Sequence, residues 1–176
     1  DEEAHPILNK KFLFLTKSAI IAAAYFTLTI LFAPISYSLM QVRIAEGLCV
    51  LAYFTPAAVP GLALGCLLSN LSSPFGLIDI VFGTLATGVA AFFASKIKNK
   101  YLVPLPSIFV NALVVGYVLK VMISVNYLLA MFWVAAGQIL ACYGIGLPLL
   151  LFIEKNKFSP VFLKNNPFFS SSHNAL

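Results

Sequence analysis

The chain has 176 residues, of which 61% are hydrophobic and only 10% are charged, and its formal net charge is +5. A soluble domain carries about 25% charged residues because polar side chains must cover its core, so this composition argues against a water-soluble fold. The basic residues form short clusters between apolar runs, whereas a nucleic-acid-binding protein gathers them on one soluble face. We therefore expect an all-α, multi-pass protein of the cell membrane, surrounded by the lipid bilayer and without a nucleic-acid partner.

The apolar runs predict six helices, since a spanning helix needs roughly 20 apolar residues. The first run stops at Pro34 and lacks a clear small-residue cleavage site, so we interpret it as a retained helix rather than a signal peptide. The next run, 44–71, is long for one span, and Pro56 and Pro60 interrupt it. Proline removes a helix donor and disfavours helix in the residue before it, so we divide this run into two short helices. The predicted order is a polar, unstructured N-terminal overhang at 1–10, a transmembrane domain at 11–154 with helices at 11–33, 44–54, 57–71, 77–95, 107–123 and 127–153, and a polar C-terminal tail at 155–176.

The lysines give the predicted orientation of the bundle. Three clusters hold nine of the eleven basic residues, and with six helices all three fall on one side, which is expected to be the cytoplasm together with both termini. A single span at 44–71 would instead put the middle cluster outside. The clusters are Lys10, Lys11 and Lys17, then Lys96, Lys98 and Lys100, then Lys155, Lys157 and Lys164.

Four charged residues remain near the opposite, extracellular ends of three predicted helices: Arg43, Glu46, Asp79 and Lys120. Ionisable residues within membrane segments are costly and mark a substrate or ion pathway by default. Their shared depth predicts a polar pocket open to the outside. Structural explanations stay open as well: Arg43 and Glu46 would neutralise each other at i and i+3, Asp79 would stabilise a helix start, and Lys120 would reach the membrane interface.

Neutral polar and aromatic residues extend the candidate site. Amides in membrane bundles also serve as hydrogen bonds between helices, and tyrosines also belong to interfacial aromatic belts. Trp133, the only tryptophan, is the better candidate for stacking on a flat ligand. The further candidates are Asn70, Asn111 and Gln138 for hydrogen bonding, with Tyr37 and Trp133 for stacking.

Several kinds of chemistry lack their sequence motifs. The chain contains no G-x-x-x-x-G-K-[ST] phosphate loop and no H-E-x-x-H pair. The three cysteines, Cys49, Cys66 and Cys142, have no metal-ligand spacing and are interpreted as buried small hydrophobes. We therefore expect no metal, no cofactor and no enzymatic activity.

Two small-residue motifs predict close helix packing. Gly61-x-x-x-Gly65 suits packing inside the bundle, whereas Ala19-x-x-x-Ala23, with Ala22 beside it, offers a flat face for either internal packing or a partner protein.

Several blocks of the sequence resemble the queuosine-precursor transporter family. The likeness runs from about Ala19 to Gly116, and the last predicted helix matches less specifically. The blocks are A-P-I-S-Y at 33–37, Q-V-R-I-A-E at 41–46, Y-F-T-P-A-A-V-P-G-L at 53–62, G-C-L-L-S-N at 65–70, L-I-D-I-V-F-G-T-L-A-T at 77–87, L-P at 105–106 and V-N-A-L at 110–113.

This resemblance implies the substrate-binding (S) component of an energy-coupling factor (ECF) transporter, a type of ABC importer for micronutrients. It implies a six-helix S-component bundle that docks through the first-helix alanine face onto a transmembrane coupling subunit. Two separate ATPase subunits would supply the energy, which agrees with the missing phosphate loop. The docking residues would be Ala19, Ala22 and Ala23.

The implied ligand is a 7-deazaguanine such as preQ1 or preQ0. Its guanine-like edge presents two adjacent N–H donors that one carboxylate accepts as a pair; Glu46 is the first choice for this role and Asp79 the second. The other acid would pair with an aminomethyl ammonium. Open alternatives are another heterocycle, such as hydroxymethylpyrimidine or pyridoxine, and a structural or enzymatic membrane protein. Donors to the ring carbonyl would be Arg43, Asn111 or Gln138, and the ring would be covered by Trp133 or Tyr37.

Overall fold

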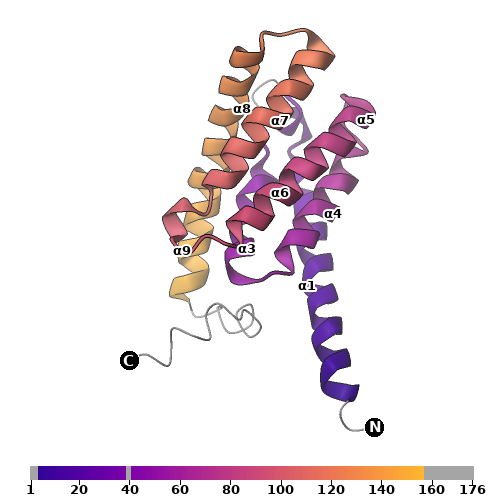
Figure 1. Ribbon diagram of the computed structural model, residues 1–176, viewed down its shortest axis with the longest axis vertical. Helices are drawn as coiled ribbons and strands as arrows, with labels where there is room; N and C mark the ends of the chain where they lie inside the picture. The colour runs from indigo at the N-terminus through magenta and orange to yellow at the C-terminus, as the bar shows by residue number, and fades with distance from the viewer. Residues whose placement is uncertain (1–3, 39–40, 157–176) are drawn as a thin grey trace.

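The computed structural model describes residues 4–38 and 41–156, with side chains from Lys10 onward. Every regular element within these ranges is a helix or helical turn, and the long helices lie alongside one another (Figure 1), which confirms the all-helical prediction for this part of the chain. The elements are α1 (Ala4–Leu31), α2 (Ala33–Ser36), the 3-10 helix η1 (Ile44–Val50), α3 (Leu51–Phe54), α4 (Ala58–Asn70), α5 (Gly76–Ile78), the π-helical turn η2 (Asp79–Gly83), α6 (Thr84–Ala94), the 3-10 turn η3 (Lys100–Leu102), α7 (Leu105–Ile123), α8 (Tyr127–Ala141), the π-helical turn η4 (Cys142–Gly146) and α9 (Leu147–Lys155).

Four stretches of helix in the described part of the chain are long and apolar enough to cross a membrane. They are 10–31, 76–94, 100–123 and 127–155, and many of their large apolar side chains are exposed. An exposed apolar surface of this extent is typical of a protein surrounded by lipid rather than water. Two shorter apolar helices, 44–54 and 58–70, complete the bundle.

Two predicted boundaries and one predicted helix type need correction. The overhang at 1–10 is wrong for residues 4–10, because α1 already begins at Ala4; Pro6 lies in the first turn, where its missing N–H costs no hydrogen bond. For the same reason α7 begins at Leu105 rather than Ser107, with Pro106 in its first turn. Within 44–54, the predicted single helix is a 3-10 helix followed by one α-helical turn. Of the predicted tail, residues 157–176 lie outside the described residues.

Close packing of α1 against α4 depends on two glycines, as the Gly61-x-x-x-Gly65 motif predicts. A Cβ on Gly61 would lie 2.7 Å from the carbonyl oxygen of Ser18, and one on Gly65 would lie 2.7 Å from Cβ of Tyr25. Only glycine allows the two backbones to approach this closely. The contact places Tyr25, in the last third of α1, deep inside the bundle.

Candidate functional site

A buried ion pair joins the residue before η1 to the start of η2. Arg43 Nη2 donates to Asp79 Oδ2 at 3.0 Å, and the two residues are only 2% and 0% exposed. The Ser73 hydroxyl donates to the same oxygen at 2.6 Å, and the guanidinium lies 5.6 Å from the ring centroid of Tyr37. Each buried charge therefore has an opposite charge beside it, the condition under which burial is tolerated.

The second carboxylate, Glu46, lies in η1 and is held by two hydroxyl groups. Tyr25 donates to Oε1 at 2.6 Å and Thr87 donates to the same oxygen at 2.9 Å. Oε2 is buried and has no hydrogen-bond partner among the described residues. Because both donors converge on one oxygen, the carboxylate is fixed in orientation while its second oxygen keeps its full capacity to accept hydrogen bonds.

Cys66 of α4 connects these two groups. Its sulfur lies 3.7 Å from Arg43 Nη1, 3.3 Å from the Thr87 hydroxyl and 3.4 Å from Asn70 Nδ2. Asn70 also donates to the backbone carbonyl of Asp79 at 3.0 Å. We call the resulting group the polar cluster; its members are Tyr25, Arg43, Glu46, Cys66, Asn70, Ser73, Asp79 and Thr87.

The backbone around the polar cluster departs from regular helix. Gln41, two residues before Arg43, has φ of 48° and is buried, and such conformations in non-glycine residues concentrate at functional sites. Asp79 begins a π-helical turn, another feature frequent at such sites. Gly83 ends that turn, and a Cβ there would lie 2.8 Å from Asn70 Nδ2 and 2.9 Å from Asp79 Oδ1. The two side chains therefore occupy their positions only because residue 83 is glycine.

Buried polar atoms without a partner gather in and around the polar cluster. Buried polar groups in native proteins are almost always hydrogen-bonded, so such a concentration calls for a functional explanation. The cluster also contains one cation, Arg43, and two carboxylates, so its net charge is −1 when all three are ionised. The atoms without a partner among the described residues include Gln41 Nε2 and Oε1, Arg43 Nε, Glu46 Oε2, Asn70 Oδ1, Asp79 Oδ1 and Asn111 Nδ2.

Acceptor oxygens on Glu46, Asn70 and Asp79 are therefore without a partner among the described residues of the polar cluster. The arrangement fits a ligand that is rich in N–H donors, and its net negative charge favours a cationic one.

The structure brings together some predicted site residues and separates others. Arg43, Glu46, Asn70 and Asp79 belong to the polar cluster, and Tyr37 adjoins it through the Arg43 contact. Tyr37 also donates its hydroxyl to the Ser69 carbonyl at 2.6 Å.

Two predicted amides are buried on other helices. Asn111 of α7 is 2% exposed, and Gln138 of α8 is 1% exposed with Oε1 3.7 Å from the sulfur of Cys142. That sulfur lies 3.6 Å from the Glu46 carbonyl, so Gln138 reaches the backbone of η1 through one intermediate residue.

Lys120 and Trp133 lie apart from the cluster. Lys120 is exposed, and its ammonium is 5.9 Å from the ring centroids of both Tyr117 and Tyr127. Trp133 is 38% exposed and makes an edge contact with Phe132. Both side chains contact aromatic rings outside the polar cluster, so the structure does not bring these two predicted site residues to Glu46.

Four members of the polar cluster were not among the predicted site residues: Tyr25, Cys66, Ser73 and Thr87. Tyr25 and Thr87 are uncharged residues within apolar helices, and in such helices hydroxyl groups are a weaker signal of a site than charged side chains. Cys66 was interpreted as a small hydrophobe, and its burial agrees with that, but its sulfur contacts polar groups.

The predicted docking face of α1 is divided. Ala19 and Ala23 are exposed, whereas Ala22 is buried against α4. A Cβ added to Gly65 would lie 2.8 Å from the carbonyl oxygen of Ala22. Ala22 is therefore part of the internal α1–α4 contact and is not accessible to a partner in this conformation.

Comparison with known proteins agrees with this architecture. Over 71 residues the chain is 37% identical to a protein named queuosine precursor transporter QueT from Lactococcus lactis subsp. cremoris; this segment covers 39% of the chain and 41% of that relative's length. No solved structure matches. Residues 15–155, which include nearly all of the described helices, match the family described as QueT transporter. The chain is therefore a multi-pass membrane protein that belongs to the QueT transporter family.

Proposed function

We propose that this chain is the substrate-binding membrane subunit of an ECF-type importer and that it captures a queuosine precursor outside the cell. The substrate class is a 7-deazaguanine such as preQ1 or preQ0. Two findings support the substrate: the family assignment, and the name of the Lactococcus relative, a queuosine precursor transporter. One structural observation carries the proposal, namely that Glu46 is held through Oε1 while its buried Oε2 has no partner among the described residues.

The chemistry of the ligand suits this carboxylate. The ring N–H and the exocyclic amino group of a guanine-like edge lie side by side and form a charge-assisted pair with one carboxylate. Glu46 is the better candidate for this role, because Arg43 already neutralises Asp79. The net charge of the cluster further favours preQ1, whose aminomethyl group is cationic, over the neutral preQ0.

Ligand binding by the purified protein tests this proposal. Isothermal titration should show binding of preQ1 and weaker binding of preQ0. Hydroxymethylpyrimidine and pyridoxine, the open alternatives, should not bind at the same concentrations. If either vitamin binds and no 7-deazaguanine does, the proposed substrate is wrong but the transport role still stands. If none of these compounds binds, the proposed site has no support.

The second part of the proposal is that partner subunits bind this chain. We propose that a transmembrane coupling subunit docks on α1 and that two ATPase subunits drive release of the substrate. Ala19 and Ala23, four residues apart and exposed, support such a contact because small side chains let another helix approach closely. Replacing both with Leu should abolish uptake in cells that contain the coupling subunits and leave ligand binding by the isolated chain unchanged. Loss of ligand binding in that variant, or undiminished uptake, would contradict docking on this face.

A further inference from the structure

A surface groove lies between the first part of α1 and the turn that joins α3 to α4. Its volume is about 510 Å³, and each residue that lines it is exposed. The groove therefore opens on the outside of the bundle, and none of its lining residues belongs to the polar cluster. We call it the α1 groove; its lining consists of Lys10, Lys11, Phe14, Leu15 and Pro56.

Charged and apolar side chains follow one another along this groove. Lys10 and Phe14 are four residues apart in α1, as are Lys11 and Leu15, so each lysine lies on the same helix face as its apolar neighbour and about one turn before it. The apolar stretch that is long enough to cross a membrane begins at Lys10. The two lysines are therefore level with the membrane surface, and the two apolar side chains lie one turn deeper.

The positive charge of the groove has no counterion in the described part of the chain. The carboxylates there are those of Glu46, Asp79 and Glu154. The first two are buried in the polar cluster, and Glu154 pairs with a lysine on another element. No described carboxylate therefore neutralises the two lysines of the α1 groove, which keep two positive charges at one end of an apolar surface.

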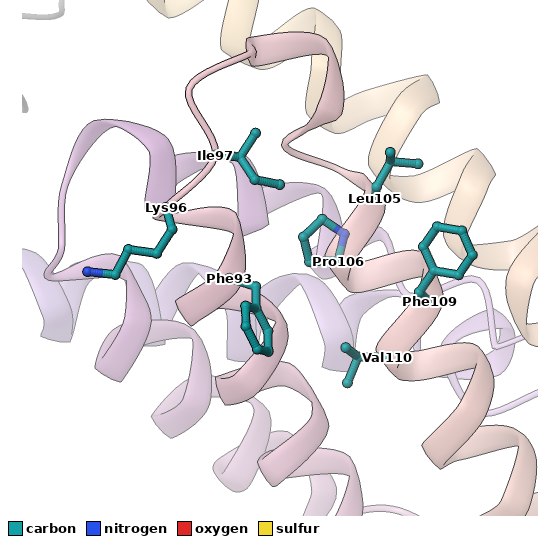
Figure 2. A pocket seen from close by; sticks show the side chains of 7 residues that line it. All are labelled: Phe93, Lys96, Ile97, Leu105, Pro106, Phe109 and Val110. Carbon is teal, nitrogen blue, oxygen red and sulfur yellow. The ribbon is translucent and has the colours of Figure 1, made fainter. Parts of the chain in front are cut away.

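A second groove, between the end of α6 and the start of α7, lacks this arrangement (Figure 2). Its walls are apolar, and Phe109 is one of them. One lysine, Lys96, lines it, and its ammonium points away from the other lining side chains. This second groove therefore provides apolar surface without a pair of lysines above it, and it supplies a control for the first.

We propose that the α1 groove binds an anionic phospholipid, with the headgroup phosphate at Lys10 and Lys11 and an acyl chain against Phe14 and Leu15. The order of charge and apolar surface in the groove matches the order of headgroup and chain in such a lipid. Basic pockets between membrane helices bind anionic headgroups, and each lysine near the membrane surface adds to the attraction. The positive-inside rule assigns these lysines to the inner leaflet.

Native mass spectrometry of the purified full chain tests the charge requirement. The chain is incubated with phosphatidylglycerol or phosphatidylcholine of identical acyl chains, and we expect preferential retention of phosphatidylglycerol. Lys10→Gln with Lys11→Gln should weaken that retention about 25-fold, since each lysine near the membrane surface contributes about a fivefold increment.

The matched control for this double variant is Lys98→Gln with Lys155→Gln. It removes the same total charge at two exposed positions that do not line the α1 groove, and it should change retention little. Equal retention of the two lipids, which is expected if the lysines only reach the membrane interface, would overturn the proposal. Equal losses in the two double variants would overturn it as well.

A second pair of variants tests the apolar part of the groove without changing any charge. Phe14→Ala removes one apolar wall and should reduce retention of phosphatidylglycerol, whereas Phe109→Ala removes an exposed ring from the second groove and should not. Undiminished retention by a folded Phe14→Ala variant, verified by its circular dichroism, would overturn the acyl-chain assignment, as would an equal loss in Phe109→Ala. Neither readout depends on the transported substrate, so failure here leaves the proposed transport function untouched.

Discussion

Glu46 is the residue on which the proposed recognition depends. Glu46→Gln keeps the oxygen that accepts from Tyr25 and Thr87 but removes the charge, so the fold should persist. Hydrogen bonds to charged groups contribute about 1.5–3 kcal/mol, so preQ1 affinity should fall roughly 10- to 100-fold. Isothermal titration of the purified variant measures this change.

The matched control for this variant is Glu154→Gln. Glu154 is exposed and pairs with Lys100 at the other end of the bundle, and exposed pairs contribute about 0–1 kcal/mol to stability. The control should bind preQ1 as the unmodified protein does. Equal loss of affinity in both variants would show that a general change of charge, rather than contact with Glu46, determines binding.

The Arg43–Asp79 pair makes a different prediction, because removal of one partner leaves the other charge buried. Asp79→Asn should lower the free energy of unfolding by about 3–5 kcal/mol. Combining it with Arg43→Met removes both charges and should restore much of that stability. If Arg43 also donates a hydrogen bond to the ligand, preQ1 binding should not recover in the double variant. Thermal unfolding in detergent and titration with preQ1 separate these two effects, and a stable Asp79→Asn variant would contradict the assigned ion pair.

At the scale of elements, the α1–α4 contact links packing to the site. An Ala side chain at Gly65 would lie 2.7 Å from Cβ of Tyr25 and 2.8 Å from the carbonyl oxygen of Ala22, so α1 must move. Overpacking of this kind costs about 1–3 kcal/mol. Because Tyr25 orients Glu46, Gly65→Ala should lower both the unfolding temperature and the preQ1 affinity.

Gly88→Ala is the control for this contact, since its Cβ would meet only Cβ of Ala63, at an ordinary 3.5 Å. Gly88 lies within α6, where alanine is about 1 kcal/mol more favourable than glycine. The control should therefore be at least as stable as the unmodified protein. A Gly65→Ala variant that behaves like this control would show that α1 and α4 can separate without disturbing Tyr25.

The helices could be predicted from sequence because lipid demands long apolar segments and proline restricts where they end. Thus 76–94 and 127–155 lie close to their predicted ranges. The π-helical turns inside these two segments could not be predicted, because apolar periodicity does not distinguish a widened turn from regular α-helix.

The site could be predicted only in part. Sequence position places Arg43, Asp79 and Lys120 near the same ends of their helices. Arg43 and Asp79 form an ion pair in the structure. The direction of each side chain around its helix axis depends on how the helices pack, which is why Lys120 points elsewhere. The bond from Tyr25 to Glu46 joins residues 21 apart in different helices, and spacing along the chain gives no sign of it.

For the whole molecule, described lysines lie beside the turn between α3 and α4 and beside the end of α9. Pro56, in the turn between α3 and α4, lines a surface groove with Lys10 and Lys11. Lys100 pairs with Glu154 near the end of α9. The turn between α7 and α8 lies at the opposite end of the bundle (Figure 1). This arrangement supports the proposal that 44–54 runs from the outer side to the cytoplasmic side and that 58–70 runs back to the outer side, with both termini cytoplasmic.

Cysteine labelling in intact cells tests that topology. The three native cysteines are buried, so an introduced cysteine gives the main signal with a membrane-impermeant maleimide. Ser72→Cys, after α4, should react in intact cells, whereas Pro56→Cys should react only after the membrane is permeabilised. If 44–71 were a single span, its middle would lie in the bilayer and Pro56→Cys would stay unreactive in both conditions. Reaction of Pro56→Cys in intact cells would invert the orientation, placing the lysine clusters outside and the polar cluster toward the cytoplasm, where it could not capture a nutrient from the medium.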